Sequence, residues 1–191
     1  MDAIAVDPIA ELFALGEGKR EWVRGSVFEV EPTSDEHDET RSYLDRVIGY
    51  YATENEAGTV KGEQFAERLS EDLVRIPDIA FFKKDNLGKI KPTFSDGGAD
   101  LVIEIVSPSS RGQDRDDKYF EYEAAGIEEY WIVDPARRRA EFYRLREGAY
   151  EPVLPDTEGK VHSSVLAGFF VRVEWLWNRP KLSGVYRELG L

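Results

Sequence analysis

Two acidic residues and one lysine of this 191-residue chain stand where charged side chains are unusual. Asp78 alternates with apolar residues along the run 73–82. Glu104 interrupts the nearly continuous aliphatic run 100–106, and Lys118 follows in a predicted helix. A buried carboxylate needs an ion-pair partner, a hydrogen bond, a proton or a bound cation. These three residues are therefore the first candidates for chemistry.

A pair of carboxylates at one end of a sheet could hold a divalent cation. Magnesium takes few carboxylates and completes its shell with waters and phosphate oxygens. Such a cation lowers the pKa of a water molecule, and a nearby lysine orients that water or neutralises charge on the phosphate. If the strands of Asp78 and Glu104 are neighbours, the expected chemistry is phosphodiester hydrolysis. The chain has no cysteine, which excludes thiolate metal sites and cysteine nucleophiles.

Each of these residues also has a plainer explanation. Asp78 follows a proline and would bond its own backbone at the start of a strand. Glu104 would form a structural ion pair with Lys118, which needs no catalysis. A lysine by itself more often covers apolar surface with its stem. The residue patterns leave these alternatives open.

The elements that must position these residues begin with a hairpin and a helix. The short apolar-rich runs 21–24 and 26–31 flank a glycine, which favours a hairpin. Thr33 and Glu36 have the spacing of a capping box at the start of a long helix. Apolar residues recur at helical spacing after it, so this helix should pack on a sheet.

A parallel crossover is predicted around Glu104. The strand 100–106 precedes a helix over 114–125, and the strand 129–133 follows, an order typical of a right-handed crossover. The runs 140–146 and 150–154 indicate further antiparallel strands. We therefore predict an α/β fold with a mixed central sheet flanked by helices.

Length and charge limit the class of protein. One domain over 1–191 is expected, with a core from about 20 to 170, a short N-terminal helix and a C-terminal tail. No apolar run reaches the roughly 20 residues of a membrane span, and the N-terminus lacks the basic start of a signal peptide, so a cytoplasmic location is expected. The net charge of -13 argues against a broad nonspecific nucleic-acid surface. Carboxylates that bind a cation contribute to that total.

Four sequence blocks together resemble the Uma family of proposed restriction endonucleases, a branch of the PD-(D/E)XK superfamily. The resemblance extends from about Glu21 to Phe169. It implies a restriction-endonuclease-like fold and a Mg²⁺- or Mn²⁺-dependent endonuclease that hydrolyses DNA phosphodiester bonds with a metal-activated water. The blocks are Ile76-Pro77-Asp78-Ile79-Ala80, Asp100 to Ser109, Asp114 to Lys118, and Tyr130-Trp131-Ile132-Val133-Asp134-Pro135.

The resemblance also implies roles for individual residues. Asp78 and Glu104 would be metal ligands, and the backbone carbonyl of Ile105 would be a third. Lys118 would be the catalytic lysine. The position two after Glu104, where the superfamily motif has its lysine, is Val106. The chain therefore departs from that motif and would draw its lysine from the following helix.

Three basic residues are weaker candidates. His37 falls where the family tends to have a histidine, and it would contact substrate or a water near the metal. Arg111 and Arg115 would contact phosphate, or they merely balance the acidic residues beside them. A homodimer is expected, since enzymes that cut both strands often pair two active sites.

Two other classes of function stay open. A non-catalytic binding or interaction protein could keep the nuclease fold after losing the reaction, which the acidic charge and Val106 favour. It predicts no metal binding at the acidic pair. A structural dimer with an aromatic interface would use the acidic pair and the lysine only as a satisfied polar core. Apolar replacements of those three residues would then be tolerated.

Overall fold

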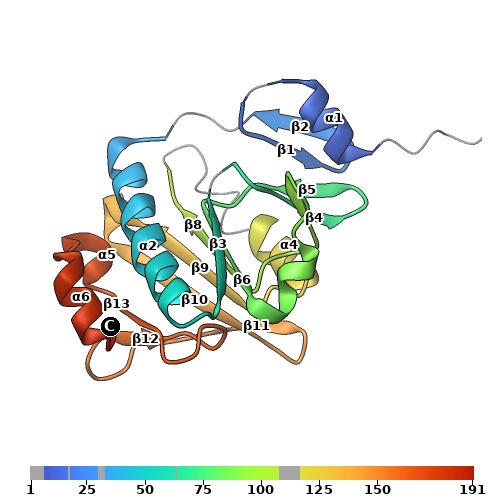
Figure 1. Cartoon of the computed structure of the whole chain (residues 1–191). Helices are drawn as coiled ribbons and strands as arrows, with labels where there is room; N and C mark the ends of the chain where they lie inside the picture. The colour runs from blue at the N-terminus through green and yellow to red at the C-terminus, as the bar shows by residue number, and fades with distance from the viewer. Residues whose placement is uncertain (1–6, 17, 30–32, 63, 108–116) are drawn as a thin grey trace, which may run out of the picture.

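A six-stranded mixed sheet forms the centre of the computed structural model, which describes residues 7–16, 18–29, 33–62, 64–107 and 117–191. Its strand order is β11-β10-β9-β8-β6-β3 (Figure 1). Strands β8 and β9 are parallel, and the other neighbours are antiparallel. The strands are β3 (Gly58–Gly62), β6 (Ile79–Lys83), β8 (Leu101–Ile105), β9 (Glu129–Asp134), β10 (Arg139–Arg146) and β11 (Ala149–Pro152).

A five-stranded sheet in the order β2-β1-β5-β4-β7 lies above the central sheet in Figure 1, and a two-stranded sheet pairs β12 with β13. These strands are β1 (Arg20–Val23), β2 (Ser26–Glu29), β4 (Ala66–Ser70), β5 (Leu73–Arg75), β7 (Phe94–Asp96), β12 (Lys160–His162) and β13 (Phe170–Arg172). The helices are α1 (Pro8–Ala14), α2 (Asp35–Glu54), α4 (Asp117–Ala124), α5 (Trp175–Asn178) and α6 (Leu182–Glu188), with 3-10 turns at Lys84–Lys89 and Pro135–Arg137.

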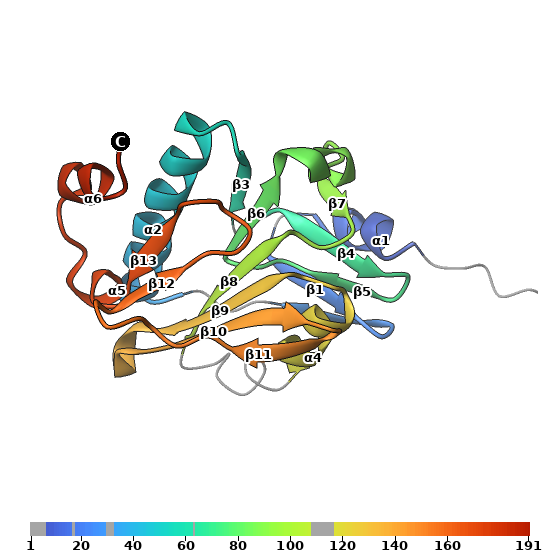
Figure 2. The same cartoon turned by 90° about the horizontal axis from the view of Figure 1, so that it is seen from below.

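Helices cover both faces of the central sheet. Figure 2 shows α2 on one side of the sheet and α4 on the other. Phe81 and Ile103 are buried in the core beneath α2, whereas Phe82 and Val102 are buried in the core beneath α4. This alternation follows from the two-residue period of a strand. The predicted mixed sheet between helices is confirmed by this arrangement.

The hairpin and the crossover that the sequence predicts are both present. Strands β1 and β2 pair in antiparallel register around a tight turn at Gly25, whose φ of 84° is easily adopted by glycine. Strand β8, helix α4 and strand β9 form the parallel crossover. Among the described residues, no helix has the length and apolar character needed to cross a membrane.

The predicted cap of the first long helix is wrong by one residue. Ser34, not Thr33, is the N-cap, and its hydroxyl accepts the backbone N–H of His37 at 3.3 Å. Ser34 has the extended backbone that an N-cap requires, with φ -76° and ψ 158°. Serine and threonine can both cap a helix, and the capping-box spacing of Thr33 with Glu36 favoured the wrong one of the two.

The run 73–82, predicted as one strand, divides between two sheets. Strand β5 belongs to the five-stranded sheet, and β6 belongs to the central sheet. Pro77 lies between them and has no N–H for a ladder, which accounts for the break. Asp78 therefore stands at the junction of the two sheets.

The C-terminal segment is more ordered than the tail predicted from the sequence. It contains α5 and α6, which lie beside α2 (Figure 1). Trp175, Leu176 and Val185 are buried in the core beneath α2. The helices have only four and seven residues, too few for a periodic pattern to identify them.

Candidate active site

Asp78 is buried at the junction of the two sheets, where three elements supply its partners. Its Oδ2 accepts the backbone N–H of Ile105 at 2.8 Å and lies 3.1 Å from Nε2 of His37. Its Oδ1 accepts from Nζ of Lys19 at 3.1 Å. The carboxylate is thus fixed by β8, by the first turn of α2 and by the segment before β1.

Strand register brings Asp78 opposite Glu104. Strands β6 and β8 pair antiparallel, and the last pair joins Ile79 to Ile103. Extending this register by one residue puts Asp78, directly before β6, level with Glu104. Residues opposite one another in such a pair share a face, with Cβ atoms about 5 Å apart. The residue before β6 and the end of β8 therefore bring the two carboxylates to the same edge of the sheet. That they share a metal stays a prediction.

Helix α4 supplies the groups that contact Glu104, which is buried with 2% exposure. Its Oε1 accepts from the hydroxyl of Tyr122 at 2.6 Å and lies 2.9 Å from Nζ of Lys118. Lys118 and Tyr122 are four residues apart, so one helical face presents both to the sheet. The contact between Lys118 and Glu104 is expected for a catalytic lysine and for a structural ion pair alike. It does not by itself separate the two.

A buried arginine behind this site was not singled out by the sequence analysis. Arg75 is 1% exposed, and its guanidinium contacts Oε2 of Glu21 and Oε2 of Glu121, each at 2.6 Å. Oε1 of Glu21 accepts the backbone N–H of Ile76 at 3.2 Å and lies 3.8 Å from Nζ of Lys118. The sequence offered one signal for this residue: Arg75 is a charged residue directly before the Ile76-Pro77-Asp78 block.

The charges at the site follow from these contacts. Burial raises the pKa of Asp78, but the hydrogen bond from His37 and the charge of Lys19 outweigh it, and the net pKa is below the usual range. Burial also raises the pKa of Glu21, but the charges of Lys118 and Arg75 lower it by more. The net pKa of Glu21 is therefore below its ordinary value. Both carboxylates are therefore ionised at neutral pH.

Tyr122 stays protonated beside Glu104. Burial and the charge of Glu104 raise the pKa of Tyr122 well above its ordinary value. The phenol therefore keeps its hydrogen at neutral pH and donates it to the carboxylate.

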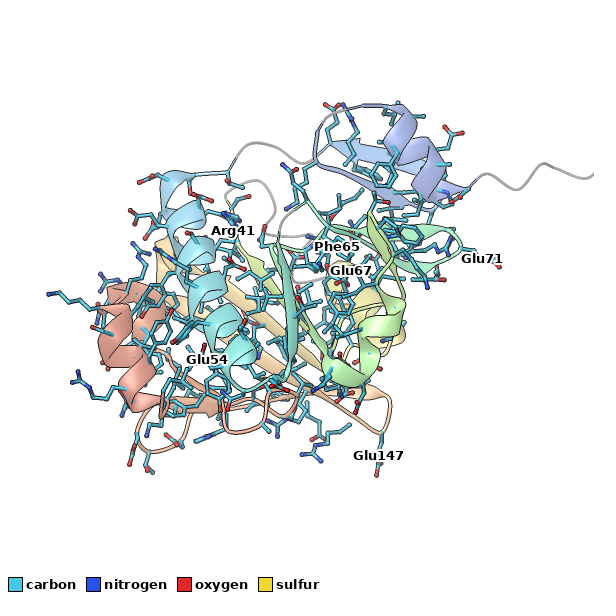
Figure 3. The ribbon with its side chains drawn as sticks, in the orientation of Figure 1. Arg41, Glu54, Phe65, Glu67, Glu71 and Glu147 are labelled. Atoms are coloured by element: carbon cyan, nitrogen blue, oxygen red, sulfur yellow. The ribbon has the colours of Figure 1, made fainter. Side chains whose placement is uncertain are left out.

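Glu67 is a fully buried carboxyl group near the site. Figure 3 shows it inside the molecule, whereas Glu71 points outward at the turn after β4. Its Oε2 accepts the backbone N–H of Ala99 at 3.3 Å, and its Oε1 has no hydrogen-bond partner among the described residues. Burial, reinforced by the charge of Glu104, raises the pKa of Glu67 to about 8. This side chain is mostly protonated near neutral pH.

The donor set at the junction fits a hard cation. Within the described part of the chain, no three His, Asp or Glu side chains gather into a complete metal cage. Magnesium is commonly held by one or two carboxylates, with waters and substrate phosphates as the other ligands. Asp78 and Glu104 supply such a pair of carboxylates. His37 contacts the carboxylate of Asp78 and fixes its orientation.

Other predicted site residues have different outcomes. Arg111 and Arg115 lie outside the described residues. Ile105 contacts Asp78 through its N–H, and the role of its carbonyl stays a prediction. Val106 is buried in the core beneath α4, and its N–H donates to the carbonyl of Val133. The position of the usual lysine is thus filled by a core residue.

Comparison with known proteins identifies the family. Residues 9–174 match the family model Uma2, described as "Putative restriction endonuclease". The fold is similar to the crystal structure of a protein from Anabaena variabilis described as a "putative nuclease belonging to DUF820", with a TM-score of 0.74 at 17% identity. That likeness covers 89% of this chain and 97% of the other. No curated protein matches the sequence. Because the family model spans most of the chain, the protein belongs to the Uma2 family.

Proposed function

We propose that the protein is an endonuclease that hydrolyses DNA phosphodiester bonds with Mg²⁺ or Mn²⁺. One observation carries the proposal: Asp78, directly before β6, accepts the N–H of Ile105, the residue after Glu104, and Lys118 lies 2.9 Å from Glu104. Two buried carboxylates and an ammonium group are the charges that metal-assisted phosphoryl chemistry requires. Membership of a family described as restriction endonucleases supports DNA as the substrate.

Each residue has a defined part in this proposal. Asp78 and Glu104 hold the cation, with the backbone carbonyl of Ile105 as a third ligand. When bound, the cation supplies Lewis-acid chemistry that activates water and offsets phosphate charge. Lys118 orients the attacking water or neutralises the charge that develops on the phosphate. His37 keeps Asp78 in one orientation through its contact at 3.1 Å.

A second candidate is a nuclease-fold protein that binds its partner without cleavage. The observation that favours it is the closed arrangement at Glu104, whose Oε1 already contacts both Lys118 and Tyr122. The net charge of -13 and the burial of Val106 agree with it. Under this alternative the acidic residues and the lysine neutralise one another and bind no metal. The homodimer and the cytoplasmic location stay predictions under both functions.

A cleavage assay separates the two functions. Supercoiled plasmid, linear duplex and single-stranded DNA are incubated with the protein and Mg²⁺ or Mn²⁺. We compare the wild type with Glu104→Gln and with Glu129→Gln, a control that changes another buried carboxylate. The carboxylate of Glu129 accepts hydrogen bonds from Nε1 of Trp131 and from Oγ of Ser163, each at 2.9 Å. Neither partner belongs to the candidate site.

The endonuclease proposal predicts cleavage by the wild type and by Glu129→Gln. Glu104→Gln should lose at least about 100-fold in rate, as removal of a group that stabilises transition-state charge commonly does. Cleavage that survives in Glu104→Gln at the wild-type rate would overturn the assignment of the site. No cleavage of any DNA form by the wild type would favour the binding protein.

A further inference from the structure

The buried ion pairs behind the candidate site connect the N-terminal hairpin to the lysine of α4. Arg75 is almost fully enclosed, and both of its carboxylate partners are themselves buried. Glu21 comes from β1, and Glu121 comes from α4, one turn after Lys118. A buried guanidinium that is shared by two carboxylates fixes all three groups in place.

The carboxylate of Glu21 is held by groups other than Glu104. Its Oε2 contacts Arg75 at 2.6 Å, and its Oε1 accepts the backbone N–H of Ile76 at 3.2 Å. The same Oε1 lies 3.8 Å from Nζ of Lys118, which in turn lies 2.9 Å from Glu104. The ammonium of Lys118 therefore stands between the carboxylates of Glu21 and Glu104.

This placement would matter if Glu104 held a cation. The cation would repel the ammonium of Lys118 and offset its attraction to Glu104. The carboxylate of Glu21 keeps its orientation, since Arg75 and the Ile76 N–H hold it independently of Glu104. Glu21 would then still attract Lys118 and keep it at the site.

We propose that Glu21 and Arg75 are positioning residues that hold Lys118 for catalysis, so that the N-terminal hairpin is part of the active site. This inference rests on the proposed endonuclease function. Glu21 acts through Lys118 and contacts neither the DNA nor the cation. Its loss therefore lowers kcat, and it leaves KM and the affinity for Mn²⁺ nearly unchanged.

A purely structural role makes different predictions. A buried ion network can serve only to join β1 and β5 to α4, and its loss then lowers stability without a specific effect on the reaction. Two residues that act as a unit are strongly non-additive in kinetics, whereas independent effects multiply. A double-mutant cycle between Glu21 and Lys118 separates these cases.

The experiment compares the wild type, Glu21→Gln, Lys118→Met and the double variant at saturating DNA and Mn²⁺. Glutamine keeps the shape of Glu21 and an acceptor for the Ile76 N–H, but it removes the charge. The kcat and KM are measured together with Tm and with Mn²⁺ affinity by calorimetry. Glu129→Gln is the matched control, a buried carboxylate outside the network.

Glu21→Gln is expected to lower kcat by roughly 10- to 100-fold, with KM and Mn²⁺ affinity within about threefold of the wild type. Lys118→Met lowers kcat further, and adding Glu21→Gln to it causes no further loss. Glu129→Gln keeps the wild-type kcat even where its Tm falls.

Several outcomes would overturn the inference. They are an unchanged kcat in Glu21→Gln, a full additional loss in the double variant, or an equal loss of kcat in Glu129→Gln. If Glu21→Gln does not fold, the triple change Glu21→Gln, Arg75→Met and Glu121→Gln removes all three buried charges and must show the same loss of kcat. An active wild type with any of these results contradicts this inference alone, whereas an inactive wild type contradicts the proposed function as well.

Discussion

Replacing Glu67 with glutamine should stabilise the protein more and more as the pH rises from 5 to 7. The pKa of Glu67 is about 8 in the fold against an ordinary value of 4.5. Between these values the folded chain keeps the proton and the unfolded chain releases it. The free energy of unfolding of the wild type therefore falls as the pH rises.

The size of the effect follows from the difference in bound protons. One proton corresponds to about 1.4 kcal/mol per pH unit, so two units give about 2.8 kcal/mol. Glutamine cannot ionise, and its oxygen can accept the Ala99 N–H in place of Oε2. The free energy of unfolding of the variant therefore does not fall with pH on account of this side chain. The difference in free energy of unfolding between the two proteins measures the ionisation of Glu67.

Urea unfolding at pH 5, 6 and 7 measures the difference. The free energy of unfolding of Glu67→Gln minus that of the wild type should grow with pH by about 1.4 kcal/mol per unit. Glu71→Gln, a change at an exposed surface position, is the control and should show a constant difference (Figure 3). A constant difference for Glu67→Gln would refute the reasoning that burial keeps this carboxyl protonated.

Three further changes test the contacts at the site and in the sheet. Tyr122→Phe removes the hydroxyl that donates to Glu104 at 2.6 Å, and urea unfolding should show a loss of about 1–3 kcal/mol. Lys19→Met removes the ammonium that lies 3.1 Å from Asp78, so calorimetry should show tighter binding of Mn²⁺ by several-fold. Gly58→Ala places a Cβ 2.0 Å from a carbonyl oxygen of β6, and thermal unfolding should show a loss of roughly 3 kcal/mol or more.

Each of these predictions has an opposing result. An unchanged stability of Tyr122→Phe would mean that Glu104 does not depend on this donor. Weaker or equal Mn²⁺ binding by Lys19→Met would argue that the cation does not meet Asp78. A Gly58→Ala protein as stable as the wild type would show that β3 and β6 can separate without cost.

The convergence of Asp78, Glu104 and Lys118 could be predicted because each signal is local. A carboxylate within an apolar strand stands out in the sequence, and the order of strand, helix and strand fixes the topology around Glu104. The structure brings these side chains to one junction. Their roles as ligands and catalyst stay predictions, because a contact between charges is compatible with several functions.

The partners behind the site could not be predicted in the same way. Arg75 and Glu21 lie 54 residues apart, and nothing in either local sequence says that they meet. Their pairing depends on how β1 and β5 are placed beside α4, which is a property of the tertiary fold. Lys19 was missed for the same reason, since it contacts Asp78 from 59 residues away.

The division of the run 73–82 was obscured by its regular alternation. Pro77 gave the signal for a break, but a bulge within one strand would have produced the same pattern. Only the pairing of β5 with β1 and of β6 with β8 shows that the chain changes sheet there. This change of sheet is what places Asp78 at a junction that Glu104 and His37 also reach.

Calorimetric titration of Mn²⁺ into the wild type and into Glu104→Gln tests the central claim most directly. Glutamine preserves the size of the side chain and removes the charge that a hard cation requires. The metal site predicts binding to the wild type that is lost or greatly weakened in Glu104→Gln. Equal binding to both proteins, or no binding to either in the presence of DNA, would contradict a metal site at Asp78 and Glu104.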